Sequence, residues 1–238
     1  FPAIKLGDIF SGDYSGIPKI TTNFKPYKFL NEYHDRGYYP FFIEDETGYH
    51  QRLATVVNIV LESDLPAAHD IEYNAVLKLK RLLYVLSRIV PYTPNISDLA
   101  RQIGSNRDTV LKYLWLLHKA DILRWISSDK HGINFLNKPD KLYLENTNIA
   151  AALNFDGRVM DKGSLRETYV LNHLSVYHQV ALPKTGDFLV DDKWILEIGG
   201  KSKSFKQIAV LDNAYIVSDD VEYIIGKKIP LWIFGFLY

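Results

Sequence analysis

The stretch that decides the fold is ISDLARQIGSNRDTVLKYLWLL, at residues 96–117. Two runs with helical spacing flank Gly104, and glycine readily adopts the left-handed conformation that ends a helix. Ser105 is the expected N-cap of the second helix, and Asp108 completes a capping-box-like pair with it. The apolar positions at helical intervals are Leu99, Ala100, Ile103, Val110, Leu114 and Leu117. The pattern predicts a helix-turn-helix, which occurs in DNA-binding proteins and also as a packing module.

The residues on either side of this stretch extend it to a winged helix. A helix is expected over Glu72–Val90, and two strands are expected over Ile122–Ser127 and Lys141–Glu145. Three helices followed by a β-hairpin are the order of elements in a winged helix, in which the hairpin is the wing. The basic residues on or near the hairpin tip are Lys130, His131 and Lys138.

The chain has no net charge, but its charges are unevenly distributed. Residues 74–125 carry nine basic and three acidic side chains, whereas residues 1–73 carry six and eleven. A basic block on a helix-turn-helix is typical of a nucleic-acid surface. The alternative is that the basic block docks on the acidic N-terminal block. The residues expected to contact DNA, opposite the apolar side of the second helix, are Asn106, Arg107, Thr109 and Lys112.

The remaining chain has a helical N-terminal part and a C-terminal part in which the apolar period changes to two. Residues 1–30 are expected to be irregular or extended, with helices after them. A helix over Gly163–Gln179 precedes the alternating runs. The expected strands are Val180–Leu182, Phe188–Val190, Trp194–Ile198, Ala214–Val217 and Leu231–Leu237, with a helix over Ser204–Leu211. The sequence predicts a mixed α and β fold: a helical segment (1–70), a winged helix (71–146) and an α/β domain with a small central sheet (147–238).

Composition and spacing exclude several chemistries. The chain has no cysteine, which excludes disulfides, thiolate metal sites and cysteine nucleophiles. The stretch Gly200-Lys201-Ser202 is no P-loop, because that motif needs a glycine at the position of Ile195, so no nucleotide site is expected here. No apolar run approaches the ~20 residues that span a bilayer, and no signal peptide is visible. A cytoplasmic protein without a membrane partner is expected.

One group of acidic residues could carry chemistry. Glu167 lies on the 163–179 helix, Asp187 starts a strand, and Glu197 ends the next strand shortly before Lys201. A helix, a hairpin and a neighbouring strand can bring three carboxylates and a lysine together. Such a cluster can bind Mg²⁺ or Mn²⁺ and activate water for phosphodiester cleavage, with Asp187 and Glu197 as metal ligands. The alternative is that each carboxylate is simply solvated.

Several stretches together resemble a known family. They are FLNEYHDRGYYPFF, SDLP, NISDLARQIGSNRDTVLKYLWLLHKADIL, KLYLENTNIAAAL, GSLRETYVLNHL and GDFLVDDKWILEIGGKSKSFKQI. The chain resembles the C-terminal part of bacterial and archaeal AAA-type ATPases that carry a C-terminal domain of unknown function, and the resemblance covers nearly the whole chain. It implies a winged helix followed by a restriction-endonuclease-like domain. It also implies an ATPase core before Phe1, so that only the full-length protein would bind ATP.

The resemblance also implies roles for individual residues. Glu167, Asp187 and Glu197 match the nuclease-like acidic positions of such proteins. A lysine usually stands two residues after the last of these, but Gly199 is there, and the lysine is displaced to Lys201. The chain is therefore expected to be a regulatory, nucleic-acid-interacting fragment of an AAA-type ATPase. The alternatives are a protein-binding scaffold with an inactive nuclease-like core and an active metal-dependent nuclease.

Overall fold

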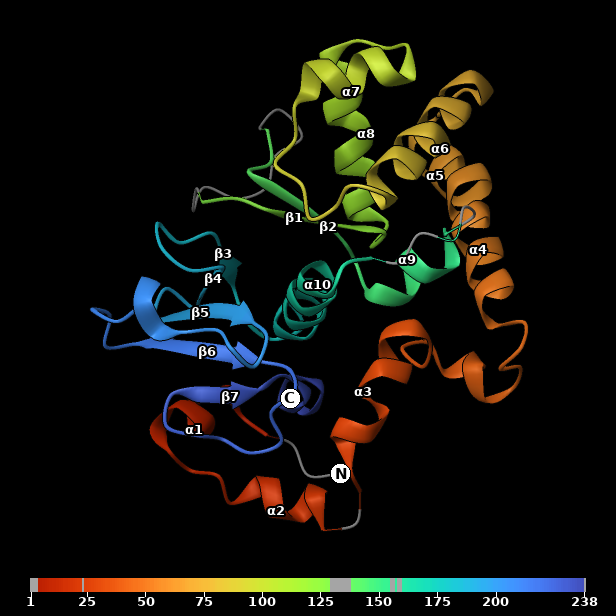
Figure 1. Cartoon of the computed structure of the whole chain (residues 1–238). Coiled ribbons are helices and arrows are strands. Elements are labelled where there is room, and N and C mark those ends of the chain that lie inside the picture. The colour runs from red at the N-terminus through yellow and green to blue at the C-terminus, as the bar shows by residue number, and fades with distance from the viewer. Residues whose placement is uncertain (1–3, 23, 129–137, 155–156, 158–159, 238) are drawn as a thin grey trace. The chain divides into compact units, whose positions relative to one another are not determined.

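A computed structural model describes residues 4–22, 24–128, 138–154, 157 and 160–237 of the chain. The fold is mixed α and β, with helices, a two-stranded sheet and a five-stranded sheet (Figure 1). Contacts divide the chain into two compact units. Unit 1 comprises residues 1–34 and 165–238, and unit 2 comprises residues 35–164. This division differs from three consecutive segments, because the N-terminal residues pack with the C-terminal sheet.

Unit 2 contains the helices around the predicted helix-turn-helix. Its elements are α4 (Tyr49–Ile59), a π-helical turn (Val60–Asp64), α5 (Leu65–His69), α6 (Tyr73–Ser87), α7 (Ile96–Ile103), α8 (Arg107–Lys119), β1 (Leu123–Ile126), β2 (Lys141–Leu144) and α9 (Thr147–Ala152). One core joins them, and its residues include Leu53, Leu79, Leu86, Leu99, Leu114 and Leu117, each at most 1 % exposed. The apolar faces predicted from helical spacing are therefore the buried faces.

The turn between α7 and α8 confirms the role predicted for Gly104 and corrects the one predicted for Ser105. Gly104 has a left-handed φ of 63° and ends α7. The Ser105 amide donates to Ala100 O at 2.9 Å, so this residue helps to close α7. The N-cap of α8 is Asn106, whose side chain accepts a hydrogen bond from Thr109 N at 2.8 Å.

The hairpin after α8 forms as predicted. Strands β1 and β2 are antiparallel, with Leu123 opposite Leu144 and Ile126 opposite Lys141. The residues between Ser128 and Lys138, including Lys130 and His131, lie outside the described residues. Lys138 itself is exposed. The observed order of α6, α7, α8 and a hairpin is the order that the sequence predicts.

Unit 1 is a five-stranded sheet with helices from both ends of the chain. Its elements are α1 (Leu6–Ser11), α2 (Gly16–Thr21), α3 (Pro26–Asp35), α10 (Lys162–Leu174), β3 (Val180–Ala181), β4 (Phe188–Val190), β5 (Trp194–Gly199), β6 (Ala214–Ser218) and β7 (Lys228–Pro230). The strands lie in this order in the sheet. Pairing is antiparallel from β3 to β5 and parallel from β5 to β7 (Figure 1).

Three predictions for unit 1 are wrong. Residues 1–30 contain the helices α1 and α2, and the ring of Phe10 in α1 stacks on Tyr215 with the ring centroids 4.1 Å apart. The segment 204–211 forms only a 3₁₀ turn at Phe205–Gln207. The segment 231–237, which was expected to be a strand, forms a 3₁₀ helix at Leu231–Phe236. The prediction failed because an apolar run without polar positions has no period that distinguishes a strand from a helix.

Among the described residues, no helix combines the length and apolar character needed to cross a membrane.

Candidate functional site

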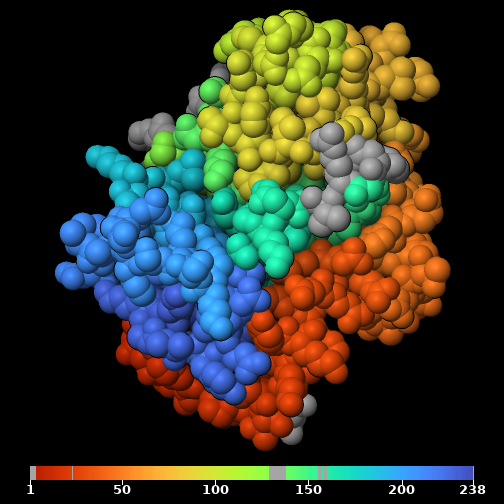
Figure 2. Space-filling model, in the orientation of Figure 1, coloured from red at the N-terminus to blue at the C-terminus, as the bar shows by residue number. Residues whose placement is uncertain are grey.

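The N-terminal half of α8 presents the residues predicted to contact DNA. Asn106, Arg107 and Lys112 are exposed, whereas Thr109 is half-buried. The opposite side of the helix is completely buried at Val110, Leu114 and Leu117. In Figure 2 the yellow and yellow-green atoms of α7 and α8 lie at the surface of the molecule. The predicted polar and apolar sides of α8 are thus separated in the structure.

Hydrogen bonds orient two of these residues. The Asn106 side chain is engaged as the N-cap of α8. Arg107 Nη1 donates to Ser97 Oγ at 2.5 Å, which brings the first turns of α7 and α8 together. Because the partner of this guanidinium is a hydroxyl, its positive charge is not neutralised by that contact. Lys112 follows one and a half turns later on the same helix.

Other charges of the basic block are paired within the unit. Lys80 forms an ion pair with Glu62, Arg101 pairs with Asp98, and Arg124 Nη2 lies 2.8 Å from Glu145 Oε1. The first of these pairs joins a lysine of the basic block to a carboxylate of the acidic N-terminal block. The exposed Asp108 lowers the charge of the first turn of α8 by one. The positive charge that remains on α8 toward solvent comes from Arg107, Lys112 and Lys119.

A buried polar group behind the hairpin was not predicted. Glu145 and Asn148 are 4 % and 0 % exposed. Tyr49 OH donates to Asn148 Oδ1 at 2.5 Å, and Asn146 Nδ2 donates to Glu145 Oε2 at 2.5 Å. Burial raises the pKa of Tyr49 above its usual value. This network joins α4, β2 and α9, and the only sequence signal for it is the polar run ENTN next to a buried strand.

In unit 1 the structure places Asp187 immediately before β4 and Glu197 within β5, the neighbouring strand. The last pair of the β4–β5 ladder at this end is Phe188 with Leu196, and Asp187 N also donates to Leu196 O, at 2.8 Å. Asp187 Oδ2 accepts a hydrogen bond from Ile198 N at 2.6 Å. Gly186 precedes this pair with a φ of 97°, and a Cβ there would lie 2.7 Å from Ile195 Cγ2. The close approach of the two strands therefore requires glycine.

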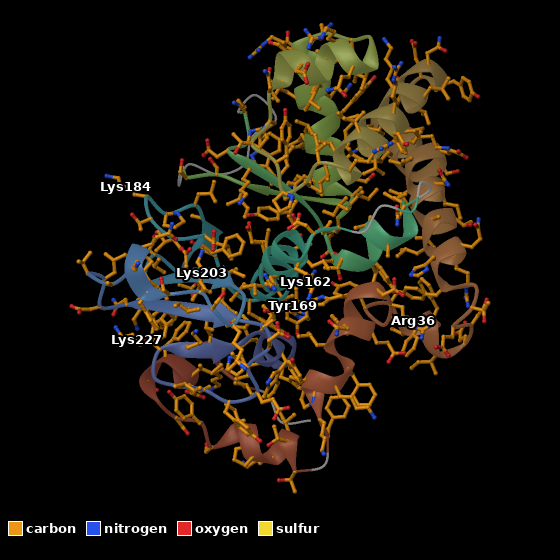
Figure 3. The ribbon with its side chains drawn as sticks, in the orientation of Figure 1. Arg36, Lys162, Tyr169, Lys184, Lys203 and Lys227 are labelled. Atoms are coloured by element: carbon orange, nitrogen blue, oxygen red, sulfur yellow. The ribbon has the colours of Figure 1, made fainter. Side chains whose placement is uncertain are left out.

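The lysine that reaches Glu197 is Lys203 and not Lys201. Glu197 is 3 % exposed, and its carboxylate forms an ion pair with Lys203 Nζ. Figure 3 labels Lys203 on the ribbon of unit 1. Lys203 N donates to Gly200 O at 2.9 Å, and this tight turn brings its side chain back over β5. A Cβ on Gly199 would lie 2.7 Å from Lys203 Cγ and Cδ, so the lysine stem uses the space that glycine leaves. Lys201 is exposed.

Glu167 is half-buried on α10, and Arg166 is its neighbour on that helix. Arg166 Nε lies 2.6 Å from Asp219 Oδ2, just beyond the end of β6. Among the described residues, no group of three or more histidines and carboxylates is placed to hold a metal ion, and Glu167 with Asp187 and Glu197 is included in that finding. With Lys203 on Glu197, these residues do not fit a divalent cation.

Comparison with known proteins gave one result. The model of a family described as a domain of unknown function (DUF8612) matches residues 27–158, which is more than half of the chain. The match spans the helix-turn-helix, the hairpin and α9, and it ends before the five-stranded sheet. No curated protein and no solved structure matched the chain significantly.

Proposed function

The chain belongs to the family of DUF8612, a domain of unknown function, and we propose that it binds double-stranded nucleic acid through the exposed side of α8. The observation that carries the proposal is the separation of α8 into a buried apolar side and an exposed side with Arg107 and Lys112. Basic side chains at the start of the second helix of a helix-turn-helix reach phosphates and base edges in the major groove.

The wider context of this function follows the resemblance stated above. We propose that the chain is the C-terminal part of an AAA-type ATPase, whose upstream core would bind ATP, and that nucleic-acid binding here regulates or targets that core. The sheet of unit 1, in this proposal, is a restriction-endonuclease-like core that does not cleave. The ion pair between Lys203 and Glu197 supports the non-catalytic version, because the carboxylate that would ligate a cation already has a counter-charge.

Charge reversal on α8 tests the proposal. The full chain is titrated against a fluorescent ~20-bp DNA duplex by anisotropy, as wild type and as Arg107→Glu/Lys112→Glu. Reversing two phosphate-contacting charges should weaken binding at least tenfold (about 1.4 kcal/mol). The matched control is Lys19→Glu/Lys184→Glu, which changes the charge equally at exposed positions of unit 1. The control should keep the wild-type affinity within about twofold, and an unchanged affinity of the α8 variant would refute DNA binding at this surface.

The same preparations separate the alternatives. Cleavage of the duplex in Mg²⁺ or Mn²⁺ that disappears in Glu197→Gln would establish a metal-dependent nuclease instead. Affinity for a protein partner with none for nucleic acid would establish the scaffold, in which the basic block serves contacts such as Lys80 with Glu62.

A further inference from the structure

One face of the sheet in unit 1 carries a row of residues from successive strands. Glu197 of β5 is paired with Ile216 of β6, and Ile216 is paired with Lys228 of β7. Paired residues share a face, so this row runs from the acidic Glu197 across the apolar Ile216 to the basic Lys228.

Residues 200–211, which form most of the segment between β5 and β6, cross this face. Its far end is anchored by Ile208, which is 1 % exposed and packs in a small cluster with Ala214 and Ile216. Ile195 and Leu211 complete the cluster at its border. Because Ile195, Ala214 and Ile216 lie on the same face as Glu197, the segment covers the face that holds this carboxylate. We name residues 200–211 the strap.

Two lysines fix the N-terminal end of the strap to the sheet, one with its side chain on the strap and the other with its side chain on the sheet. Lys203 extends from the strap to Glu197. Lys228 extends from the sheet to the strap, where its Nζ donates to Lys201 O at 3.0 Å and to Lys203 O at 3.1 Å. The backbone and a side chain of the strap are therefore both fixed to the charged row.

The ion pair between Lys203 and Glu197 matters for stability because Glu197 is buried. A carboxylate that is almost fully buried is costly unless a counter-charge accompanies it. Removing that counter-charge leaves the carboxylate to take up a proton, to be solvated, which requires the strap to lift, or to bind another cation. Gly199 and the turn at Gly200 are what allow the chain to supply the ammonium itself.

We propose that Lys203 acts as a tethered cation on Glu197, and that the strap is a built-in cover held closed by this ion pair. The covered face is then closed both to a divalent cation and to an incoming phosphate. The proposal concerns unit 1 alone and does not depend on nucleic-acid binding by α8.

The test replaces the ammonium and keeps the stem, in Lys203→Met of the full chain. The matched control is Lys206→Met, which makes the same change at an exposed position of the strap. Melting temperature is measured with and without ~1 mM MnCl₂, and amide hydrogen exchange is followed over residues 200–211. Wild type and the control should not respond to Mn²⁺. Lys203→Met should melt about 5 °C lower or more, exchange faster in the strap, and regain stability with Mn²⁺ in a saturable manner.

A second variant keeps the test decisive if Lys203→Met does not fold. Glu197→Gln/Lys203→Met removes both charges, so it should fold, melt above Lys203→Met and show no response to Mn²⁺. The proposal is overturned if Lys203→Met exchanges and melts like Lys206→Met. It is equally overturned if wild type binds Mn²⁺, if Lys203→Met gains no Mn²⁺ response, or if the double variant is no more stable than Lys203→Met.

Discussion

Three consecutive residues close the turn before α8, and each has a separate task. Gly104 takes the left-handed conformation, Ser105 donates its amide to the end of α7, and Asn106 caps α8 with its side chain. An N-cap side chain satisfies an amide that has no partner within the helix. The stability of the helix-turn-helix should therefore depend on Asn106 more than on Ser105.

Alanine substitution separates these tasks. Asn106→Ala should lower the free energy of unfolding by about 1 kcal/mol, because Thr109 N loses its side-chain acceptor. Ser105→Ala keeps the amide that closes α7 and should cost less than about 0.5 kcal/mol. Urea unfolding of the two variants beside wild type, followed by circular dichroism, gives both values. Equal losses would show that Ser105 shares the cap.

Residues of equal chemistry limit what the sequence can predict at this scale. Serine and asparagine are both good N-caps, so the sequence cannot say which of Ser105 and Asn106 takes the extended conformation. The lysines after Glu197 pose the same problem. Lys201 is nearer in sequence, but the turn closed by Lys203 N on Gly200 O turns the later lysine toward the carboxylate.

The helices and strands of the fold differ in how well the pattern of apolar residues predicted them. Elements with one apolar face, such as α6, α8, β4 and β5, lie where the period places them. The apolar run 231–236 has no polar side, since Leu231, Ile233 and Phe234 are all buried. Its apolar period therefore could not distinguish a strand from a helix, and the strand prediction was wrong. The prediction of a helix within the strap failed for a different reason. The conformation of the strap is fixed by tertiary contacts of Lys203 and Ile208, and such contacts leave no pattern in the local sequence.

Helices α3 and α10 meet through a cluster of histidine and tyrosine rings. The rings of His34 and Tyr169 lie 5.0 Å apart, and Tyr33 OH lies 3.3 Å from His173 Nε2. Burial lowers the pKa of His34 and of His173 from 6.5 to about 4. Both imidazoles are therefore neutral in the folded protein at neutral pH.

This contact between α3 and α10 should weaken in acid. Between pH 6.5 and 4 the unfolded chain binds protons that the folded chain does not, so stability is complete above pH 6.5 and falls as the pH drops to 4. Each pKa unit corresponds to about 1.4 kcal/mol, so the loss should be a few kcal/mol. Urea unfolding at pH 7 and pH 5 should show a smaller difference for His34→Gln/His173→Gln than for wild type. The control His69→Gln, at an exposed position, should behave like wild type. A pH dependence that all three share would contradict the assignment.

At the scale of the whole molecule, the chain is organised as a middle unit and a unit made from its two ends. The family match over residues 27–158 nearly coincides with the middle unit. Sequence reasoning found the helix-turn-helix, the hairpin and the central sheet. It could not find that residues 4–34 join the sheet, because contacts such as Ile4 N with Phe236 O connect distant segments and produce no periodic signal.

The charge distribution also belongs to this scale, because the proposal of nucleic-acid binding concerns only one of the units. The basic block predicted from the sequence lies in unit 2, and part of it is neutralised internally. The positive charge that remains on α8 predicts how the affinity for nucleic acid should depend on salt concentration. Each phosphate that a lysine neutralises releases counterions and makes the logarithm of affinity fall with the logarithm of salt concentration by about 0.9.

The most direct test of nucleic-acid binding by α8 is therefore the salt dependence of duplex affinity for wild type and Lys112→Gln. Anisotropy titrations of the full chain from about 50 to 200 mM salt give the two slopes. We expect a steep slope for wild type and a slope smaller by about 1 for the variant, because one phosphate contact is lost. Affinity that does not change with salt, or identical slopes for the two proteins, would contradict the account.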